Sequence, residues 1–138
     1  MIRKIISQLR LRIGSASIDL ILDKDEFRPG EKVTGYFFLK GGRFEQKINR
    51  LECDLVVTDE QKKEERFTES AVTRLMSKPI SSKESSQIPF TFQLPSKLDT
   101  SPSKCSYRFR TKLVFSDGTK SVNHDQIKIL NEKNQLAN

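Results

Sequence analysis

The sequence predicts an all-β fold, an antiparallel two-sheet β-sandwich of about seven strands with an immunoglobulin-like arrangement. Three observations support this prediction. Apolar side chains alternate with polar or basic ones from Cys105 to Phe115, and again from Ile88 to Leu94. A period of two places successive side chains on opposite faces of a strand, so that one face can enter a core. Turn sequences separate these stretches, and the lack of helix-length segments between them argues against a parallel α/β sheet.

The expected strands follow one another at short intervals from residue 16 onward. Turns are expected at Pro29-Gly30, at Gly41-Gly42 and at Asp117-Gly118, the last as a hairpin between two strands. Gly35 falls inside the second strand, where a glycine marks either a bulge or a close approach of another backbone. The expected strands span residues 16–22, 32–40, 47–58, 64–75, 88–94, 105–115 and 119–130.

The weakest of these strands is residues 64–75, which alternate poorly. Phe67, Ala71 and Leu75 are the inward candidates. We expect an edge strand that its charges protect from pairing with other chains. Residues 77–87, rich in Ser and Lys, are expected to be a polar connection.

The last strand changes phase along its length. Val122 and His124 lie on one parity, whereas Ile127 and Ile129 lie on the other. Because an extra residue in one strand reverses the facing of all that follow, we expect a β-bulge near residues 124–126.

The composition indicates one folded domain with a polar surface. The chain has 138 residues, of which 35% are hydrophobic and 31% charged, and this length can bury a two-sheet core. Its net charge of +7 favours acidic partners. No stretch approaches the roughly 18 apolar residues that a membrane-spanning helix needs, and polar residues interrupt the N-terminus where a signal peptide would be apolar. We therefore expect a cytoplasmic protein.

Residues 2–13 form a basic, amphipathic N-terminal segment distinct from the strands. Three alternatives are open: the segment packs on the sandwich, binds a partner in a groove, or lies on an anionic membrane. The expected organisation is residues 1–13 as this segment, 14–130 as the sandwich and 131–138 as a polar tail. The apolar positions with helical spacing include Ile2, Ile5, Ile6 and Leu9.

Two motifs in order resemble those of a known fold family. Residues 27–35, Phe-Arg-Pro-Gly-Glu-Lys-Val-Thr-Gly, are similar to the aromatic-x-Pro-Gly-Glu-x-Val-x-Gly signature of arrestin-like N-terminal domains. Residues 88–95, Ile-Pro-Phe-Thr-Phe-Gln-Leu-Pro, resemble their Pro-Phe-x-Phe-x-Leu-Pro strand. Residues 40–42 and 45–48 are similar to the bacterial sporulation-control branch of that fold. The motif positions are Phe27, Pro29, Gly30, Gly35, Pro89, Phe90, Phe92 and Pro95.

This resemblance, which covers roughly residues 14–130, implies an arrestin-like sandwich that acts as a non-enzymatic adaptor or regulator. Its motif residues build turns and fill a core, so they specify a fold and carry no chemistry. The family commonly joins two such sandwiches in tandem, and this chain has room for one.

The candidate chemical groups do not combine into a recognisable site. Cys53 and Cys105 lie on the apolar parity of their strands, so burial disfavours their thiolates. His124 is the only histidine, and a Cys–His pair is conceivable, but the sequence shows no metal-ligand spacing and no phosphate-binding loop. We predict no catalytic residues, no metal and no cofactor.

The candidate binding residues are Arg108, Arg110 and Lys112, three cations on one strand face. Either carboxylates on neighbouring strands, Asp125 or a Glu of an adjacent strand, offset their repulsion, or the row attracts an acidic protein. Nucleic acid is disfavoured because the interleaved aromatic residues point to the core. Sheet edges, or the face that a second lobe would cover, could also allow self-association. A membrane surface remains the alternative partner for residues 2–13.

Overall fold

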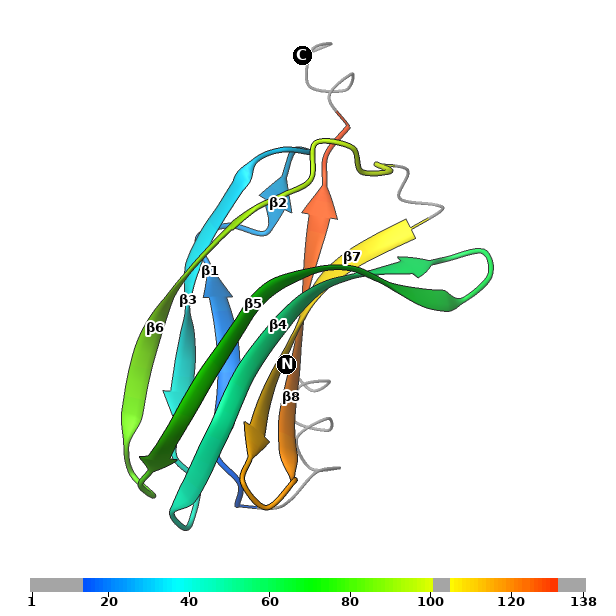
Figure 1. Cartoon of the computed structure of the whole chain (residues 1–138). Coiled ribbons are helices and arrows are strands. Elements are labelled where there is room, and N and C mark those ends of the chain that lie inside the picture. The colour runs from blue at the N-terminus through cyan, green and yellow to red at the C-terminus, as the bar shows by residue number, and fades with distance from the viewer. Residues whose placement is uncertain (1–13, 101–104, 132–138) are drawn as a thin grey trace.

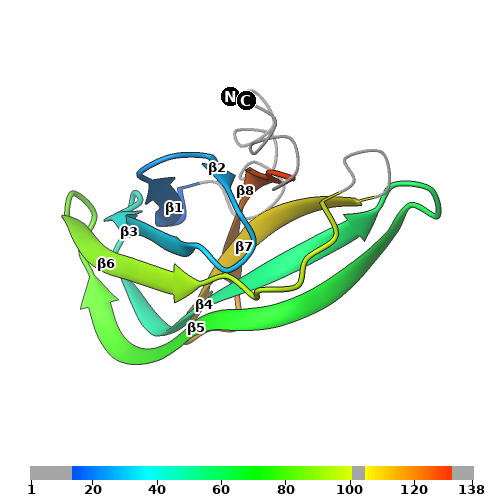
Figure 2. The same ribbon diagram turned by 90° about the horizontal axis from the view of Figure 1, so that it is seen from above.

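Two β-sheets pack face to face in a sandwich (Figures 1 and 2). The computed structural model describes residues 14–100 and 105–131, with the side chains of residues 67–70 left aside. One sheet has the order β1-β3-β6 and the other β2-β8-β7-β4-β5, so the all-β sandwich is confirmed. The strands are β1 (Ser17–Leu22), β2 (Glu26–Phe27), β3 (Lys32–Lys40), β4 (Gln46–Asp59), β5 (Glu64–Ile80), β6 (Ser85–Gln93), β7 (Cys105–Phe115) and β8 (Lys120–Ile129).

The core forms where the inward faces of the two sheets meet. The predicted alternation in β7 is confirmed. Its odd-numbered residues from Tyr107 to Phe115 are all buried. Phe90 of β6 packs edge to face against Phe37 of β3, with ring centroids 5.2 Å apart, and against Phe109 of β7 at 5.5 Å. Such aromatic pairs add about 0.5–1.5 kcal/mol each beyond the area they bury. Phe109 therefore joins the two sheets.

The two arrestin-like motifs lie side by side. β3 pairs with β6 antiparallel, with Val33 opposite Phe92. Beyond the pairing, the Gly30 N–H donates to the Pro95 carbonyl at 2.9 Å, and the Leu94 N–H donates to the Glu31 carbonyl at 2.9 Å. The Pro-Gly turn and the end of the second motif thus form one hydrogen-bonded unit.

At Gly35 the backbone of β1 closely approaches β3. The β3–β6 pairing runs past Gly35 without a shift, and the β1–β3 pairing reaches Gly35 in regular register, so the position is a close approach and not a bulge. A Cβ atom built on Gly35 would lie 2.1 Å from the Ile21 carbonyl oxygen. Only glycine fits there without displacing β1.

The polar connection expected over residues 77–87 is wrong. β5 continues to Ile80 and β6 begins at Ser85, so the turn is short. β5 extends this far because it pairs with β4 and not because of its hydrophobic pattern. β4 begins early enough for Gln46 to pair with Ile80. The buried Gln46 side chain also accepts a hydrogen bond from the Ala16 N–H at 2.6 Å.

β5 is at the edge of the five-stranded sheet, as expected, but its inward residues differ. Leu75 is 82% exposed, so its assignment to the core is wrong. Ala71 packs against the core as predicted, and Val72 and Met76 do so as well. Register shifts in the β4–β5 pairing change which side chains face inward, and a sequence pattern does not show them. The predicted inward Phe67 lies outside the described side chains.

β2 is an addition to the predicted strands. This two-residue strand pairs parallel with the end of β8, and its Phe27 is buried. The Lys128 N–H donates to the Asp25 carbonyl at 2.8 Å, and the Leu130 N–H donates to the Phe27 carbonyl at 2.7 Å. Two residues are too few to produce a periodic signal in the sequence.

The bulge expected near residues 124–126 is wrong. β8 pairs with β7 in unbroken register from Lys120 to Ile127. The inward face of β8 instead carries polar residues at one end, since Ser121 and Asn123 are buried there. The Asn123 amide donates to a carboxylate oxygen of Asp19 at 3.0 Å and also to Asp125. These hydrogen bonds offset the cost of burying polar groups.

Two sequence predictions lie outside the described residues: the amphipathic segment of residues 2–13, and residues 132–138 of the polar tail. Within the part of the chain that the structure describes, no helix is long and apolar enough to cross a membrane.

Replacing Gly35 by Ala should destabilise the fold, because the new methyl group would meet the backbone of β1. We expect a loss of about 1–3 kcal/mol in the free energy of unfolding, the usual cost of overpacking. Urea unfolding measures it. The control is Gly118→Asn, since Gly118 sits in open space with φ of 87°, which Asn tolerates. An unchanged Gly35→Ala midpoint would contradict the close approach.

Candidate functional site on the outer face of the five-stranded sheet

The predicted cation row lies on the outer face of β7. Arg108, Arg110 and Lys112 occupy the parity opposite to the buried Phe109, and all three are half-buried. β7 lies between β4 and β8, so side chains of both neighbouring strands flank the row. The face is therefore a shared surface of several strands and not a property of β7 alone.

Arg108 and Arg110 converge on one carboxylate, that of Glu65 on β5. Arg110 lies 2.7 Å from one Glu65 oxygen, and Arg108 is hydrogen-bonded to the other. Arg110 also reaches Asp54 of β4 at 3.7 Å, and Arg108 donates to the Thr58 hydroxyl at 2.8 Å. The alternative in which neighbouring carboxylates offset the cations is thus the arrangement found.

The pair of guanidinium groups changes the acidity of Glu65. Partial burial raises the pKa of this carboxyl, but hydrogen bonds and charge from Arg108 and Arg110 outweigh it, so the pKa lies below its ordinary value of 4.5. The carboxylate is therefore ionised at neutral pH and stays between its two cations. Arg110 remains incompletely satisfied, because its buried Nε atom has no hydrogen-bond partner among the described residues.

His124 of β8 joins the same network. The Arg108 Nε–H donates to Nδ1 of His124 at 3.2 Å, which requires that this nitrogen carry no proton. Burial, and then the charges of Arg108 and Arg110, lower the pKa of His124 below its ordinary 6.5, with Glu65 opposing them. The histidine is thus held neutral as an acceptor.

Lys112 extends the row toward a second ion pair. It lies opposite Glu52 in the β4–β7 pairing, and Glu52 already contacts the Arg50 guanidinium at 2.6 Å. Two further valines, Val56 and Val114, share this outward face and are nonetheless buried. The surface therefore combines paired charges with covered apolar side chains.

Sequence analysis predicted the three cations but missed the residues that contact them. Glu65, Asp54 and Thr58 come from two other strands, and only the strand order brings them to β7. Asp125, one of the two kinds of partner expected, faces inward beside Asn123 instead. The available signal for these contacts was a charged residue on the outward face of a nearby strand. To use that signal, one must already know the strand order.

The two thiols are separated from the histidine. Cys53 is fully buried beside the Thr111 hydroxyl at 3.5 Å, and burial raises its pKa to about 12. Cys105 is only half-buried, in contrast to the expected apolar interior, and burial raises its pKa as well. His124 faces outward at the opposite surface of β8 from Asn123. The conceivable Cys–His pair is therefore not formed.

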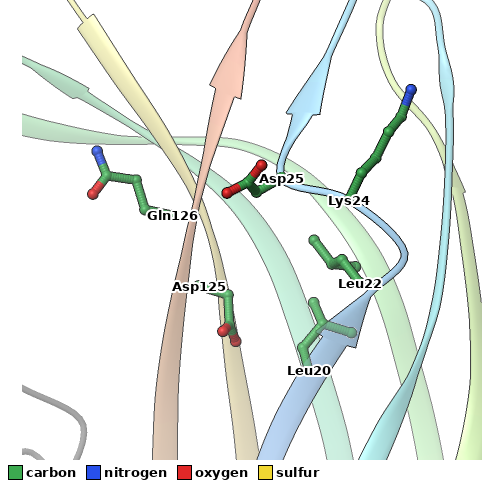
Figure 3. A pocket seen from close by; sticks show the side chains of 6 residues that line it. All are labelled: Leu20, Leu22, Lys24, Asp25, Asp125 and Gln126. Carbon is green, nitrogen blue, oxygen red and sulfur yellow. The ribbon is translucent and has the colours of Figure 1, made fainter. Parts of the chain in front are cut away.

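Two shallow cavities lie near β1 and β2, away from the cation row. The first holds about 340 Å³ between the end of β1 and β8. Figure 3 shows Leu20 and Leu22 on one side and Asp125 and Gln126 on the other, with Asp25 and Lys24 nearby. The second, of about 530 Å³, adjoins the Pro29-Gly30 turn. Within the described residues, no group of three or more His, Cys, Asp or Glu side chains could hold a metal ion.

Comparisons with known proteins identify the family. The family model of the SpoOM protein, Spo0M, matches residues 3–137, nearly the whole chain. The chain belongs to the Spo0M family. This agrees with the resemblance of its motifs to bacterial sporulation-control proteins.

A curated relative and a solved structure support the assignment. The chain is 32% identical over 120 residues to the sporulation-control protein spo0M of Bacillus subtilis (strain 168), covering 83% of this chain and 46% of the relative. It superposes on the crystal structure of Spo0M from Bacillus subtilis with a TM-score of 0.71 at 28% identity, covering 86% of this chain and 51% of that one. The chain thus spans about half the length of the Spo0M proteins that it matches.

Acidification should loosen the network around His124. Below the ordinary pKa of 6.5 the unfolded chain takes up a proton that the folded state resists, so stability falls as pH drops from 6.5 through the lower folded pKa. Glu65 adds its own loss only at lower pH, below about 4.5.

An NMR titration measures the effect, because the chain has a single histidine. We expect a midpoint below 6.5 that rises in Arg108→Gln, and a melting temperature that depends less on pH in His124→Gln. A midpoint at or above 6.5 in the unmodified protein would contradict the contact with Arg108.

Proposed function

We propose that this chain is a non-enzymatic interaction module of sporulation control, which binds an acidic segment of a protein partner on the outer face of β7. Membership of the Spo0M family supports the regulatory role. The cytoplasm remains the expected place of action. The proposal assigns the binding to Arg108, Arg110 and Lys112.

The observation that carries the proposal is the convergence of two half-buried arginines on Glu65. Their side chains are only 20% and 24% exposed, whereas that of Glu65 is 46% exposed. Arginine forks held in fixed positions recognise carboxylates in bidentate geometry and are frequent hot spots of protein interfaces. Glu65 thus occupies the position that a partner's carboxylate would take.

The internal ion pair is weak enough to be exchanged. Exposed salt bridges contribute a median of about 0–1 kcal/mol, because solvent screens them and both side chains lose entropy. A partner that offers two or more carboxylates can replace Glu65 and also reach Lys112, whose cross-strand neighbour Glu52 is already paired with Arg50.

The direct test removes the cations. Arg108→Ser, Arg110→Ser and Lys112→Ser together should abolish capture of a specific protein from a lysate of sporulating Bacillus subtilis. The matched control is Lys32→Ser, Lys62→Ser and Lys97→Ser, which removes the same charge from exposed positions elsewhere and should capture the protein as the unmodified chain does. Thermal melts check that all variants are folded.

A second variant makes the test sharper. Glu65→Gln removes the internal carboxylate and leaves both arginines, so it should strengthen binding of the same partner. Equal binding by the unmodified chain and the triple Ser variant would overturn the proposed site. Weaker binding by Glu65→Gln would show that the carboxylate contacts the partner rather than competing with it.

Self-association is a separate prediction, based on the edge position of β5. Unpaired N–H and C=O groups along an edge strand can accept another strand. We expect light scattering to show a mass that grows with protein concentration, and Leu75→Lys to reduce that growth. A constant monomer mass at high concentration would contradict it.

A further inference from the structure

One end of the sandwich collects basic side chains that the proposed function does not use. The turns β3–β4, β5–β6 and β7–β8 all lie at the lower end of Figure 1. Within three residues of these turns the chain carries six cations, all exposed. We call them the basic end: Lys40, Arg43, Lys47, Lys78, Lys83 and Lys120.

Backbone contacts hold these turns together as one surface. The Gly41 N–H donates to the Glu84 carbonyl at 2.7 Å, and the Ser116 N–H donates to the Lys47 carbonyl at 2.9 Å. A Cβ atom on Gly41 would lie 1.9 Å from the Ser81 carbonyl oxygen, so the β3–β4 and β5–β6 turns touch. The cations are therefore fixed relative to one another by the fold.

The charge of the described residues is concentrated at this end. Residues 14–100 and 105–131 contain 19 Lys and Arg against 17 Asp and Glu, a net charge of +2. The three turns and their flanks contribute six cations against Glu45, Glu84 and Asp117, a net of +3. The remainder of the described residues is thus close to neutral, at −1.

The basic end also differs from the opposite end in its ion pairs. There, Lys24 contacts Glu31, Lys63 contacts Glu60, and Lys128 contacts Glu26. No ion pair joins any cation of the basic end to another described residue. Two of its three carboxylates accept hydrogen bonds within their own turns, Glu84 from the Ser81 N–H and Asp117 from the Thr119 N–H. All six cations are exposed, and none has an ion-pair partner among residues 14–100 and 105–131.

The chemistry of this surface fits a broad anionic layer better than a single carboxylate. Five of the six cations are lysines, which act as hydrated point charges, whereas arginine is the residue that forks onto individual carboxylates. The turns between them consist largely of Gly and Ser, such as Gly41-Gly42 and Ser81-Ser82, so a flat surface can approach the tips closely. Neither of the described cavities lies among these residues.

The chain enters the described structure at this end. Gly14, where the described structure begins, accepts a hydrogen bond from the Arg43 N–H at 2.7 Å. Residues 1–13, which join the sandwich there, carry four cations and no acidic residue.

We propose that the basic end docks the protein, end on, to an anionic lipid surface. The outer face of β7 then points sideways and stays accessible to a protein partner. Each lysine near an anionic membrane strengthens binding about fivefold, and salt screens the attraction over roughly 10 Å.

Vesicle sedimentation of the whole chain tests the proposal. Phosphatidylcholine vesicles with about 30% phosphatidylserine should bind the protein, whereas pure phosphatidylcholine vesicles should not. Lys40→Gln, Lys83→Gln and Lys120→Gln together should weaken binding by at least about tenfold, and raising salt to about 0.5 M should abolish it.

The matched control keeps the net charge equal. Lys32→Gln, Lys62→Gln and Lys97→Gln remove the same three charges from exposed positions at the opposite end, and this variant should bind nearly as the unmodified chain does. Equal losses in both triple variants would show that net charge alone matters, and would overturn the proposal. A failure of the unmodified chain to bind vesicles would also overturn the proposal. This holds even if the chain binds an acidic peptide through the same lysines.

Discussion

The structure depends on the contact of Phe109 with the aromatic residues of β6. Phe109 lies 5.5 Å from Phe90 and 5.9 Å from Phe92 by ring centroids, and these contacts bring the two sheets together. Because side chains alternate along a strand, placing Phe109 inward places Arg108 and Arg110 outward. The same contact that forms the core thus determines the surface on which the candidate site is built. The hydrogen bonds between the Pro-Gly turn and Pro95 hold β6 in the position that this contact requires.

The inner face of β8 shows how a polar strand can belong to a sandwich. Ser121 and Asn123 are buried although both side chains are polar. Asn123 links β8 to Asp19 of β1, a strand of the other sheet. A buried amide with satisfied hydrogen bonds restricts how the sheets can shift relative to each other, whereas an apolar contact would be less directional. This polar contact complements the aromatic one at the opposite side of the core.

The two proposed surfaces differ in their chemistry. On the outer face of β7, arginines are half-buried, held by Glu65 and placed within an ion network. At the basic end, lysines are exposed and solvated. The first arrangement suits directional recognition of a few carboxylates, and the second suits long-range attraction to a charged layer. Both surfaces can be occupied together because one lies on a sheet face and the other at the tips of the turns (Figure 1). A protein of this design could bring a partner to a membrane.

The sequence by itself determined the sandwich, the inward column of β7 and the outward row of cations. Alternation over eleven residues is a local property, and it requires only a period of two. The two motifs likewise predicted the resemblance to sporulation-control proteins, which the family comparison confirms.

Only the tertiary structure decided what depends on strand neighbours. Strand order and register are non-local properties. They determine which residues contact Arg108 and Arg110, why Leu75 is exposed, and why β8 pairs with β7 without a bulge. A shift of one residue between β4 and β5 reverses which side chains face the core, and no local pattern in β5 reports that shift. The basic end was hidden for the same reason, because its cations are spread over three turns that are distant in the sequence and meet only in the folded chain.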